Sequence, residues 1–279
     1  IDNYIDGFHN SYEWGYSIPY FLAGSHSAHV NNISYLSAKA GIASRDINFL
    51  LNRLDPVERK RYDYSLLEKT YLDYQNTHCE DDSAIASLQN ALSGKDILVL
   101  LPGHTIKTCQ GQIQHFYKEK NPIVISVNLL TDCYPIDFAY FSNKNRYQYW
   151  RNEAAFNKCK KIVTSNVTTR KDDNLFIIDF LRLVKCGWEQ LDNSGVLLLR
   201  LLDLMNVNSI SIAGFDGYSH NSENPNYVEK AMEKTRNTLN AEEANKDIKS
   251  MLLDYKNTRR SSCPISFITP SYFETVMDE

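Results

Sequence analysis

The residues with the most evident chemical potential follow an apolar segment at 209–213. The run Gly214-Phe-Asp216-Gly-Tyr218-Ser-His220 places a carboxylate, a phenol and an imidazole close together. Asp216 could hold a divalent metal or a ribose hydroxyl, Tyr218 could hydrogen-bond a leaving phosphate, and His220 could act as a general base near neutral pH. The same letters also suit a tight turn with Asp-Gly at its centre and an exposed His220. We predict catalytic roles for Asp216, Tyr218 and His220, with the turn as the alternative.

Small and amide residues follow the other apolar segments as well. Such residues let backbone N–H groups approach a phosphate, and Asn or Ser can hydrogen-bond a base or a ribose. Turns need the same residue types, so each position alone also has a purely structural interpretation. We predict nucleotide contacts for Gly103, His104, Thr105, Asn128, Ser142, Asn143, Thr164, Ser165, Asn166, Gly214 and Gly217. Asn193, Ser194 and Gly195 join this set at the start of a predicted helix, where a ligand contact and simple capping remain alternatives.

Several standard motifs are missing from the sequence. It contains neither GxGxxG nor GxxxxGK[ST], so the usual dinucleotide and P-loop interpretations are weak. The cysteines are widely spaced and include no CxxC, and His26 and His29 have no evident third ligand. We therefore predict no metal site, and Mg²⁺ enters only together with a nucleotide.

The elements that position these residues alternate from Lys95 onward. Short segments with the pattern of strands occur at 96–101, 123–127, 137–141, 161–165, 175–178, 209–213 and 265–268. The first contains a continuous apolar run, as expected for a strand buried on both faces of a parallel sheet. Helical patterns separate many of these segments, at about 105–120, 147–158, 194–205 and 226–256. This alternation predicts an α/β fold with a mostly parallel, Rossmann-like sheet and helices on both faces. In such a sheet, ligands bind beyond the carboxyl ends of the strands, which is where the predicted site residues lie.

Residues 1–92 have a different pattern, with helical periodicity and no convincing strand. The helices are expected at 33–40, 44–54, 64–74 and 84–92. We place the domain boundary near Ser93-Gly94, between a helical segment at 1–92 and a nucleotide-binding domain at 95–279. Because the chain starts at Ile1 and is rich in aromatic residues at 12–21, we expect it to be a fragment of a longer protein.

Composition narrows the class of protein. The formal net charge of −4 argues against a nucleic-acid binder, and no apolar run reaches the roughly 18–20 residues that span a bilayer. The scattered cysteines favour reduced thiols and hence a cytoplasmic protein.

A first resemblance covers about residues 1–80. It is carried by Tyr16–Gly24, His26–Asn32 and Ser44–Asn48. These segments resemble the region after the TIM barrel in aldolases of the HMG-CoA lyase-like superfamily, in a subgroup from surface-polysaccharide gene clusters. The resemblance implies an upstream aldolase (lyase) domain. The metal-binding motifs of that barrel are absent here, so it assigns no aldolase chemistry to any residue of this chain.

A second resemblance covers about residues 95–220. It is carried by Leu101–Lys107, Ser126–Asn128, Asn193–Val196 and Ile212–Tyr218. These segments resemble bacterial sialyltransferases that use CMP-sialic acid, and the related hydroxymethylpterin pyrophosphokinase-like fold. The resemblance implies nucleotide contacts from Gly103, Thr105, Asn128, Ser194 and Gly195, and a Tyr218 that supports the leaving phosphate. The sequence departs from the family at His104-Thr105, where a Pro-Ser pair is usual, and no histidine follows His220.

The resulting hypothesis is a glycosyltransferase-like transferase of surface-glycan synthesis. Its donor would be a nucleotide-activated sugar, with a CMP-activated acidic sugar favoured, and its acceptor a glycan. One alternative is a Mg²⁺-dependent pyrophosphoryl transferase in which Asp216 holds the metal. Another is a non-catalytic accessory module of the aldolase, binding product or forming a homo-oligomer through the aromatic residues at 12–21.

Overall fold

The computed structural model describes residues 78–168, 174–185, 187–188, 193–219 and 241–278. Several predictions lie outside these residues: the helices expected within 1–77, the aromatic residues 12–21, His220, and the first part of the helix expected at 226–256.

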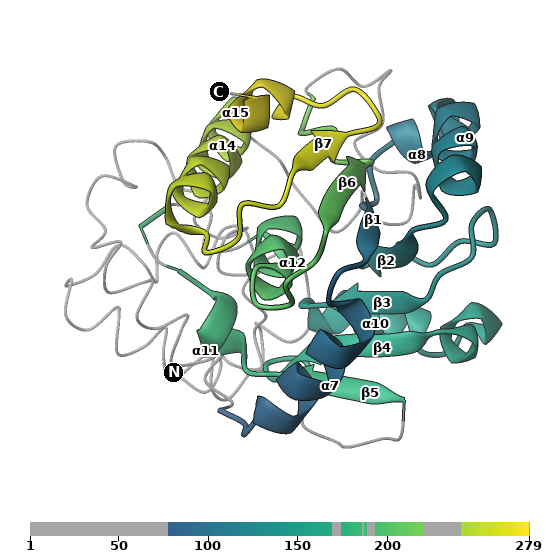
Figure 1. Cartoon of the computed structure of the whole chain (residues 1–279), viewed down its shortest axis with the longest axis vertical. Coiled ribbons are helices and arrows are strands. Elements are labelled where there is room, and N and C mark those ends of the chain that lie inside the picture. Colours follow the sequence, from purple (N-terminus) through teal and green to yellow (C-terminus); the bar gives the residue numbers. More distant parts are fainter. Residues whose placement is uncertain (1–77, 169–173, 186, 189–192, 220–240, 279) are drawn as a thin grey trace, which may run out of the picture. The chain divides into compact units, whose positions relative to one another are not determined.

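A parallel sheet of seven strands forms the centre of the described domain (Figure 1). The strands are β1 (Asp96–Leu100), β2 (Ile123–Val127), β3 (Phe138–Phe141), β4 (Lys160–Thr164), β5 (Leu175–Ile178), β6 (Ser209–Ala213) and β7 (Ile265–Phe267). Their order is β5-β4-β3-β2-β1-β6-β7, and every neighbouring pair is parallel. The predicted α/β, Rossmann-like fold is thereby confirmed.

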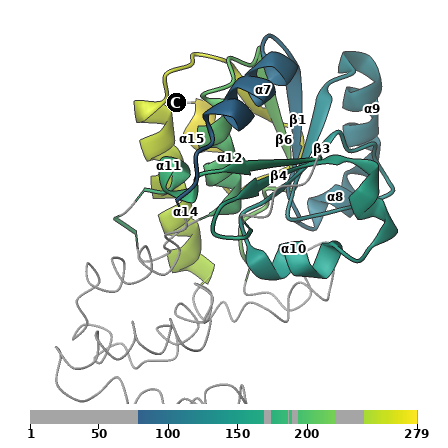
Figure 2. The same ribbon diagram turned by 90° about the horizontal axis from the view of Figure 1, so that it is seen from below.

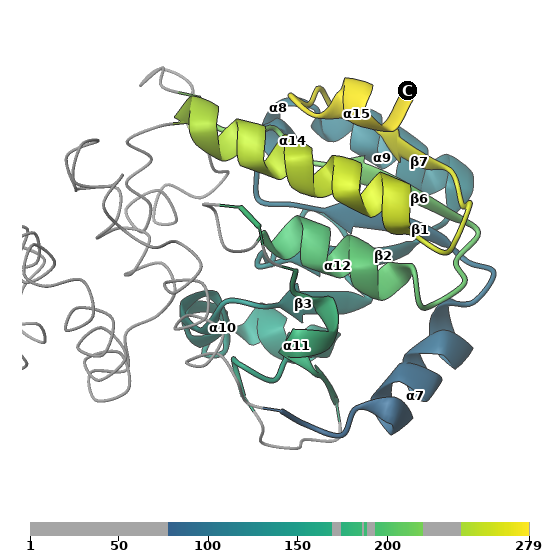
Figure 3. The same cartoon turned by 90° about the vertical axis from the view of Figure 1, so that its left-hand side faces the viewer.

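Helices cover both faces of the sheet (Figures 2 and 3). One face carries α8 (Thr105–Thr108), α9 (Gln110–Lys120) and α10 (Lys144–Trp150), and the other carries α12 (Ser194–Leu202) and α14 (Ala241–Thr258). The other helices among the described residues are α7 (Asp82–Leu92), α11 (Phe180–Leu183), α15 (Glu274–Asp278) and the 3-10 helix η1 (Ala154–Lys158). In the part of the chain that the structure describes, no helix is long and apolar enough to cross a membrane.

The helix predicted at 147–158 is two elements. Glu153 has extended backbone dihedrals, φ −84° and ψ 142°, and separates α10 from η1. Both pieces deliver an aromatic side chain to one apolar cluster, because Phe156 is part of it and Trp150 packs against it. A continuous helix is therefore replaced by a break that lets both rings reach the sheet.

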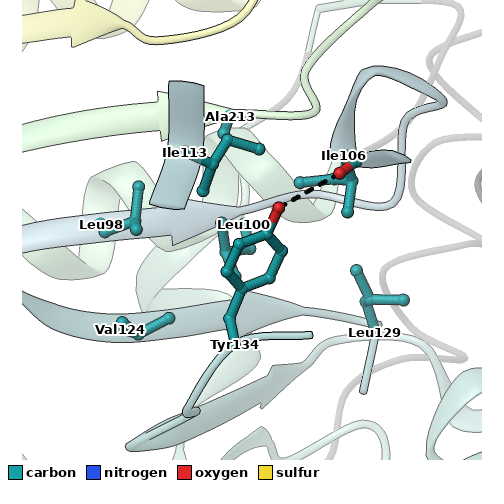
Figure 4. Packing of buried hydrophobic residues seen from close by; sticks show 8 residues of the cluster. All are labelled: Leu98, Leu100, Ile106, Ile113, Val124, Leu129, Tyr134 and Ala213. Atoms are coloured by element: carbon teal, nitrogen blue, oxygen red, sulfur yellow. Dashed lines mark hydrogen bonds between the residues drawn. The ribbon is translucent and has the colours of Figure 1, made fainter. Parts of the chain in front are cut away.

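An apolar cluster fixes α8 and α9 against β1 (Figure 4). It consists of Leu98, Leu100, Ile106, Ile113, Val124, Leu129, Tyr134 and Ala213. The hydroxyl of Tyr134 donates a hydrogen bond to the Ile106 carbonyl at 3.3 Å, and burial raises the pKa of Tyr134 to about 12. Ile106 is 4% exposed, so its burial holds the start of α8 in place beyond the end of β1. The neighbouring residue Thr105 is thereby positioned for the site described below.

Helix α7 belongs to the same compact unit as the sheet, although the sequence pattern places it with residues 1–92. Its residues Leu88 and Leu92 are fully buried. The buried carboxylate of Asp81, just before α7, accepts hydrogen bonds from the Arg182 Nε at 2.9 Å and from the Asp179 backbone N–H at 3.0 Å. These contacts attach the start of α7 to the segment that follows β5.

Candidate functional site

The strand order reverses at β1, whose neighbours are β2 on one side and β6 on the other. Ligands of open parallel sheets bind at such a point, beyond the carboxyl ends of the strands. The predicted site residues at this edge fall into two groups. We call Asn128, Ser142 and Ser194 the amide–hydroxyl group, and Thr105 with Asp216 the Asp216–Thr105 pair.

The amide–hydroxyl group joins the ends of β2 and β3 to the start of α12. The Asn128 side-chain amide donates to the Ser194 hydroxyl at 2.8 Å, and the hydroxyls of Ser142 and Ser194 lie 2.7 Å apart. Each hydroxyl has a single proton, and one of the two is used between Ser142 and Ser194. The other proton remains as a donor, so the group has a hydroxyl donor to offer a ligand.

Asn128 is held in a left-handed backbone conformation with φ 52°. The Asn128 N–H donates to the Tyr140 carbonyl at 2.8 Å. The Asn128 carbonyl accepts from the Trp150 indole N–H at 3.1 Å. The residue is 9% exposed, and its side-chain oxygen Oδ1 is buried without a hydrogen-bond partner. An unpaired buried acceptor costs about 1–3 kcal/mol, and strained backbone of this kind clusters at functional sites. The fold therefore keeps a fixed, unused acceptor at the edge of the sheet.

The start of α12 is capped from within. The Asn193 side-chain oxygen accepts from the N–H groups of Gly195 at 2.9 Å and Val196 at 3.2 Å, so Asn193 is the N-cap. A Cβ on Gly195 would lie 2.7 Å from the Leu101 side chain, so glycine allows α12 to approach the end of β1. This close approach brings Ser194 within reach of Asn128.

The predicted residues after β3 and β4 mainly contact one another. The Thr164 hydroxyl donates to the Asn166 side-chain oxygen at 2.5 Å, and the Asn166 amide donates to the Ser142 carbonyl at 3.2 Å. The Ser165 hydroxyl accepts from the Phe180 N–H at 3.0 Å, at the start of α11. Thr164 and Asn166 thus hold Ser142 in position, whereas Ser165 anchors α11. Asn143, the next residue after Ser142, accepts from the Arg146 N–H at 3.1 Å at the start of α10.

The Asp216–Thr105 pair closes the turn between β1 and α8. Asp216 Oδ2 accepts from the Thr105 N–H at 2.8 Å, and Oδ1 accepts from the Thr105 hydroxyl. The same hydroxyl lies 3.1 Å from that of Thr269, which accepts from the Gly214 N–H at 2.9 Å. Burial raises the pKa of the Asp216 carboxyl, and the hydrogen bonds from Thr105 act in the opposite direction. The N–H of Thr105, predicted to contact a phosphate, therefore already binds a carboxylate of the protein.

Two glycines let the β1 and β6 turns touch. The Gly103 N–H donates to the Gly214 carbonyl at 3.0 Å, and a Cβ on either glycine would overlap backbone atoms of the opposite turn. Gly214 also has φ +77°, a conformation that side chains disfavour. His104 lies between these contacts, where its carbonyl accepts from the Lys107 N–H at 3.0 Å.

Asn245 is a site residue that the sequence analysis missed. Its side chain bridges the backbone of Tyr218, accepting from the N–H at 2.8 Å and donating to the carbonyl at 2.8 Å. Asn245 is 3% exposed and belongs to the buried stripe of α14, with Ala241, Ile248, Leu252 and Tyr255. A lone amide in an apolar stripe is the signal that could have identified it. The neighbouring Gly217 has φ +88° and passes close to Asn245 and Tyr272.

In the described ranges, the candidate site offers amides, hydroxyls, the half-buried carboxylate of Asp216 and the phenol of Tyr218. Within those ranges, no three His, Cys, Asp or Glu side chains are grouped so as to hold a metal ion. A scan against protein-family models found no match for the sequence, and a search of curated proteins found no significant match.

Proposed function

We propose that the domain binds a nucleotide at the carboxyl edge of its sheet and transfers the sugar of a nucleotide-activated donor, favouring a CMP-activated acidic sugar. The observation that supports this most strongly is the buried, unpaired Oδ1 of Asn128 beside a hydroxyl pair with a spare proton. Ligand sites typically combine such fixed polar groups with a concave surface.

The two kinds of polar group suit different parts of a nucleotide. Asn128 Oδ1 would accept from an amine of the base or from a ribose hydroxyl, because both are donors. The spare proton of the Ser142–Ser194 pair would be donated to a ribose or phosphate oxygen. The positive end of the α12 dipole would favour a phosphate close to Ser194.

The transfer step would be a direct displacement at the anomeric carbon. An acceptor hydroxyl forms a bond to that carbon while the bond from carbon to the phosphate oxygen breaks, releasing CMP. Tyr218 would donate a hydrogen bond to the departing phosphate, and His220 or Asp216 would take the acceptor proton. The raised pKa of Asp216 suits a base, because it is a stronger base than an ordinary carboxylate.

The Mg²⁺-dependent pyrophosphoryl transferase needs Asp216 to hold the metal. Both oxygens of Asp216 already accept hydrogen bonds from Thr105, so a metal would have to share or replace these contacts. Under the accessory-module hypothesis, Asp216 and Thr105 would only stabilise the turn, and the edge of the sheet would bind no nucleotide.

The proposal also includes a cellular location and a longer chain. We propose a cytoplasmic enzyme of surface-glycan synthesis attached to an upstream aldolase domain, acting on a glycan acceptor. Cys79, Cys109, Cys133, Cys159 and Cys263 are free thiols, as a reducing compartment maintains.

A thermal-shift panel tests the proposal against its alternatives. The protein is heated with CMP, CDP, UDP, GDP, ADP, ATP or GTP, each with and without Mg²⁺. A ligand at about 100 times its Kd stabilises the fold by about 2.7 kcal/mol. A selective shift with CMP is expected. A shift with ATP that requires Mg²⁺ would reject the sugar-transfer proposal in favour of the pyrophosphoryl transferase. No shift with any nucleotide would favour the accessory-module hypothesis.

A further inference from the structure

Tyr272 is the most exposed large hydrophobic side chain of the described residues, with 56% of its surface accessible. It lies between β7 and α15, in the loop next to the end of β6. A single exposed aromatic residue is common on protein surfaces. Its significance here depends on how the loop is held and on what lies beside it.

The loop around Tyr272 is firmly attached. The Tyr272 N–H donates to the Asp216 carbonyl at 3.2 Å, and the Ser271 hydroxyl donates to the Phe215 carbonyl at 2.6 Å. The next residue, Phe273, is fully buried, and its ring packs on that of Phe215 with centroids 4.9 Å apart. An exposed ring is therefore presented on fixed backbone.

Tyr272 adjoins the part of the site that would bind the leaving phosphate. A Cβ built on Gly217 would lie 2.9 Å from the Tyr272 Cβ, so the side chain begins directly against Gly217. Tyr218 is the following residue, and Asn245 fixes its backbone by accepting from its N–H and donating to its carbonyl. Tyr272 therefore lies directly beside Gly217, the residue that precedes Tyr218.

We propose that Tyr272 binds the acceptor, by packing its ring against the apolar C–H face of an acceptor sugar. This inference rests on the proposed function. In a displacement, the acceptor oxygen and the leaving phosphate flank the same carbon, so the acceptor's sugar ring must lie close to the residue that contacts the phosphate. A fixed tyrosine offers contact area at a low entropic cost, and its hydroxyl can bond a sugar hydroxyl.

A sugar suits this position better than a protein surface. The other exposed large hydrophobic side chains in the described part of the chain are Tyr149, Leu181 and Leu253. They come from three different helices, α10, α11 and α14. A stable protein interface needs a contiguous patch of several hundred Å² on each partner, whereas one ring matches the area of one sugar.

Saturation-transfer NMR on the full chain tests the inference, with methyl β-D-galactoside and methyl β-D-glucoside as probes in the presence of CMP. We expect transfer to the C–H protons of at least one glycoside. Tyr272→Ala should weaken it about fivefold, and Tyr272→Phe should preserve it, because the ring supplies the contact. Tyr149→Ala is the matched control, since it removes another exposed tyrosine and should change nothing.

Two results would overturn the acceptor role: no transfer to either glycoside in the unmodified protein, or equal transfer in Tyr272→Ala. The thermal shift with CMP is recorded on the same samples. A CMP shift without glycoside contact would reject Tyr272 alone. Glycoside contact without a CMP shift would reject the proposed donor site and leave sugar binding at Tyr272.

Discussion

The carboxylate of Asp216 accepts a hydrogen bond from the Thr105 backbone N–H at 2.8 Å, so the end of β6 supplies a negative charge to the start of α8. The sequence predicts a phosphate contact at this same N–H group, which is already hydrogen-bonded to the carboxylate. A ligand phosphate is consequently expected nearer to Ser194 and the start of α12. Asp216 then both positions the β1 turn and remains the candidate base.

Replacing this carboxyl by an amide should change how stability depends on pH. Burial raises the folded-state pKa of Asp216 above 3.8, the ordinary value of an aspartate. Its contribution to stability is therefore complete below that value and is lost as the pH rises through the folded-state pKa. Asp216→Asn keeps a similar shape without the titration, so its stability relative to the unmodified protein should increase as the pH rises above about 4, the ordinary carboxyl value. Urea unfolding at each pH measures this, and a constant difference would contradict the raised pKa.

Gly214→Ala should be much more destabilising than Gly94→Ala. Both glycines have left-handed φ angles, +77° and +69°. A Cβ on Gly94 meets nothing within 4 Å, whereas one on Gly214 overlaps the Leu101 carbonyl. Backbone strain alone costs about 1–2 kcal/mol, so we expect that for Gly94→Ala and more than about 3 kcal/mol for Gly214→Ala. Similar losses in the free energy of unfolding would mean that the β1 and β6 turns are not in contact.

Asn245→Ala should destabilise the protein by removing the side-chain bridge to the Tyr218 backbone. It leaves the Tyr218 N–H and carbonyl without their side-chain partner, at a cost of about 1–3 kcal/mol. The amide of Tyr218 should also exchange with solvent faster, which hydrogen-exchange NMR measures. Ser250→Ala in the same helix removes only a hydrogen bond to the Lys246 carbonyl on the exposed surface, and serves as the control. Unchanged exchange at Tyr218 would show that Asn245 does not hold this backbone.

Asp81→Ala tests the attachment of α7 to the sheet. The Asp81 side chain is 1% exposed and bonds Arg182, whereas that of Asp82 is 85% exposed. Because 41% of the Arg182 side chain is itself accessible, solvent screening lowers the value of the pair, and we expect a loss of about 1–3 kcal/mol. Asp82→Ala should change the free energy of unfolding by less than about 1 kcal/mol. Equal effects of the two substitutions would argue against a buried attachment.

The central strands could be predicted from sequence because they are short apolar runs buried on both sides, as in β1, where four of five residues are buried. The edge strands β5 and β7 are less buried. The short helices α11 and α15, of four and five residues, offer too few turns for a periodic pattern. The break at Glu153 depends on where Trp150 and Phe156 must pack, which is a tertiary constraint.

Part of the geometry of the candidate site could be predicted in a similar way. The rule that strand ends gather at one edge indicated Asn128 and Ser142, and the helix start indicated Ser194. Which group binds which is a matter of distance in space, so the pairing of Asp216 with Thr105 could not be seen. Asn245 escaped for the same reason, because its partner Tyr218 is 27 residues away in the chain.

Calorimetric titration of CMP into the protein and two variants tests the central claim most directly. Asn128→Gly removes the unpaired acceptor while glycine tolerates its φ of 52°. Asn121→Gly is the matched control, since Asn121 also has a left-handed φ, 45°, but is the exposed C-cap of α9. We expect CMP to bind the unmodified protein and Asn121→Gly with equal affinity, and Asn128→Gly to weaken binding about tenfold. Failure of CMP to bind the unmodified protein, or equal affinity in Asn128→Gly, would contradict this claim.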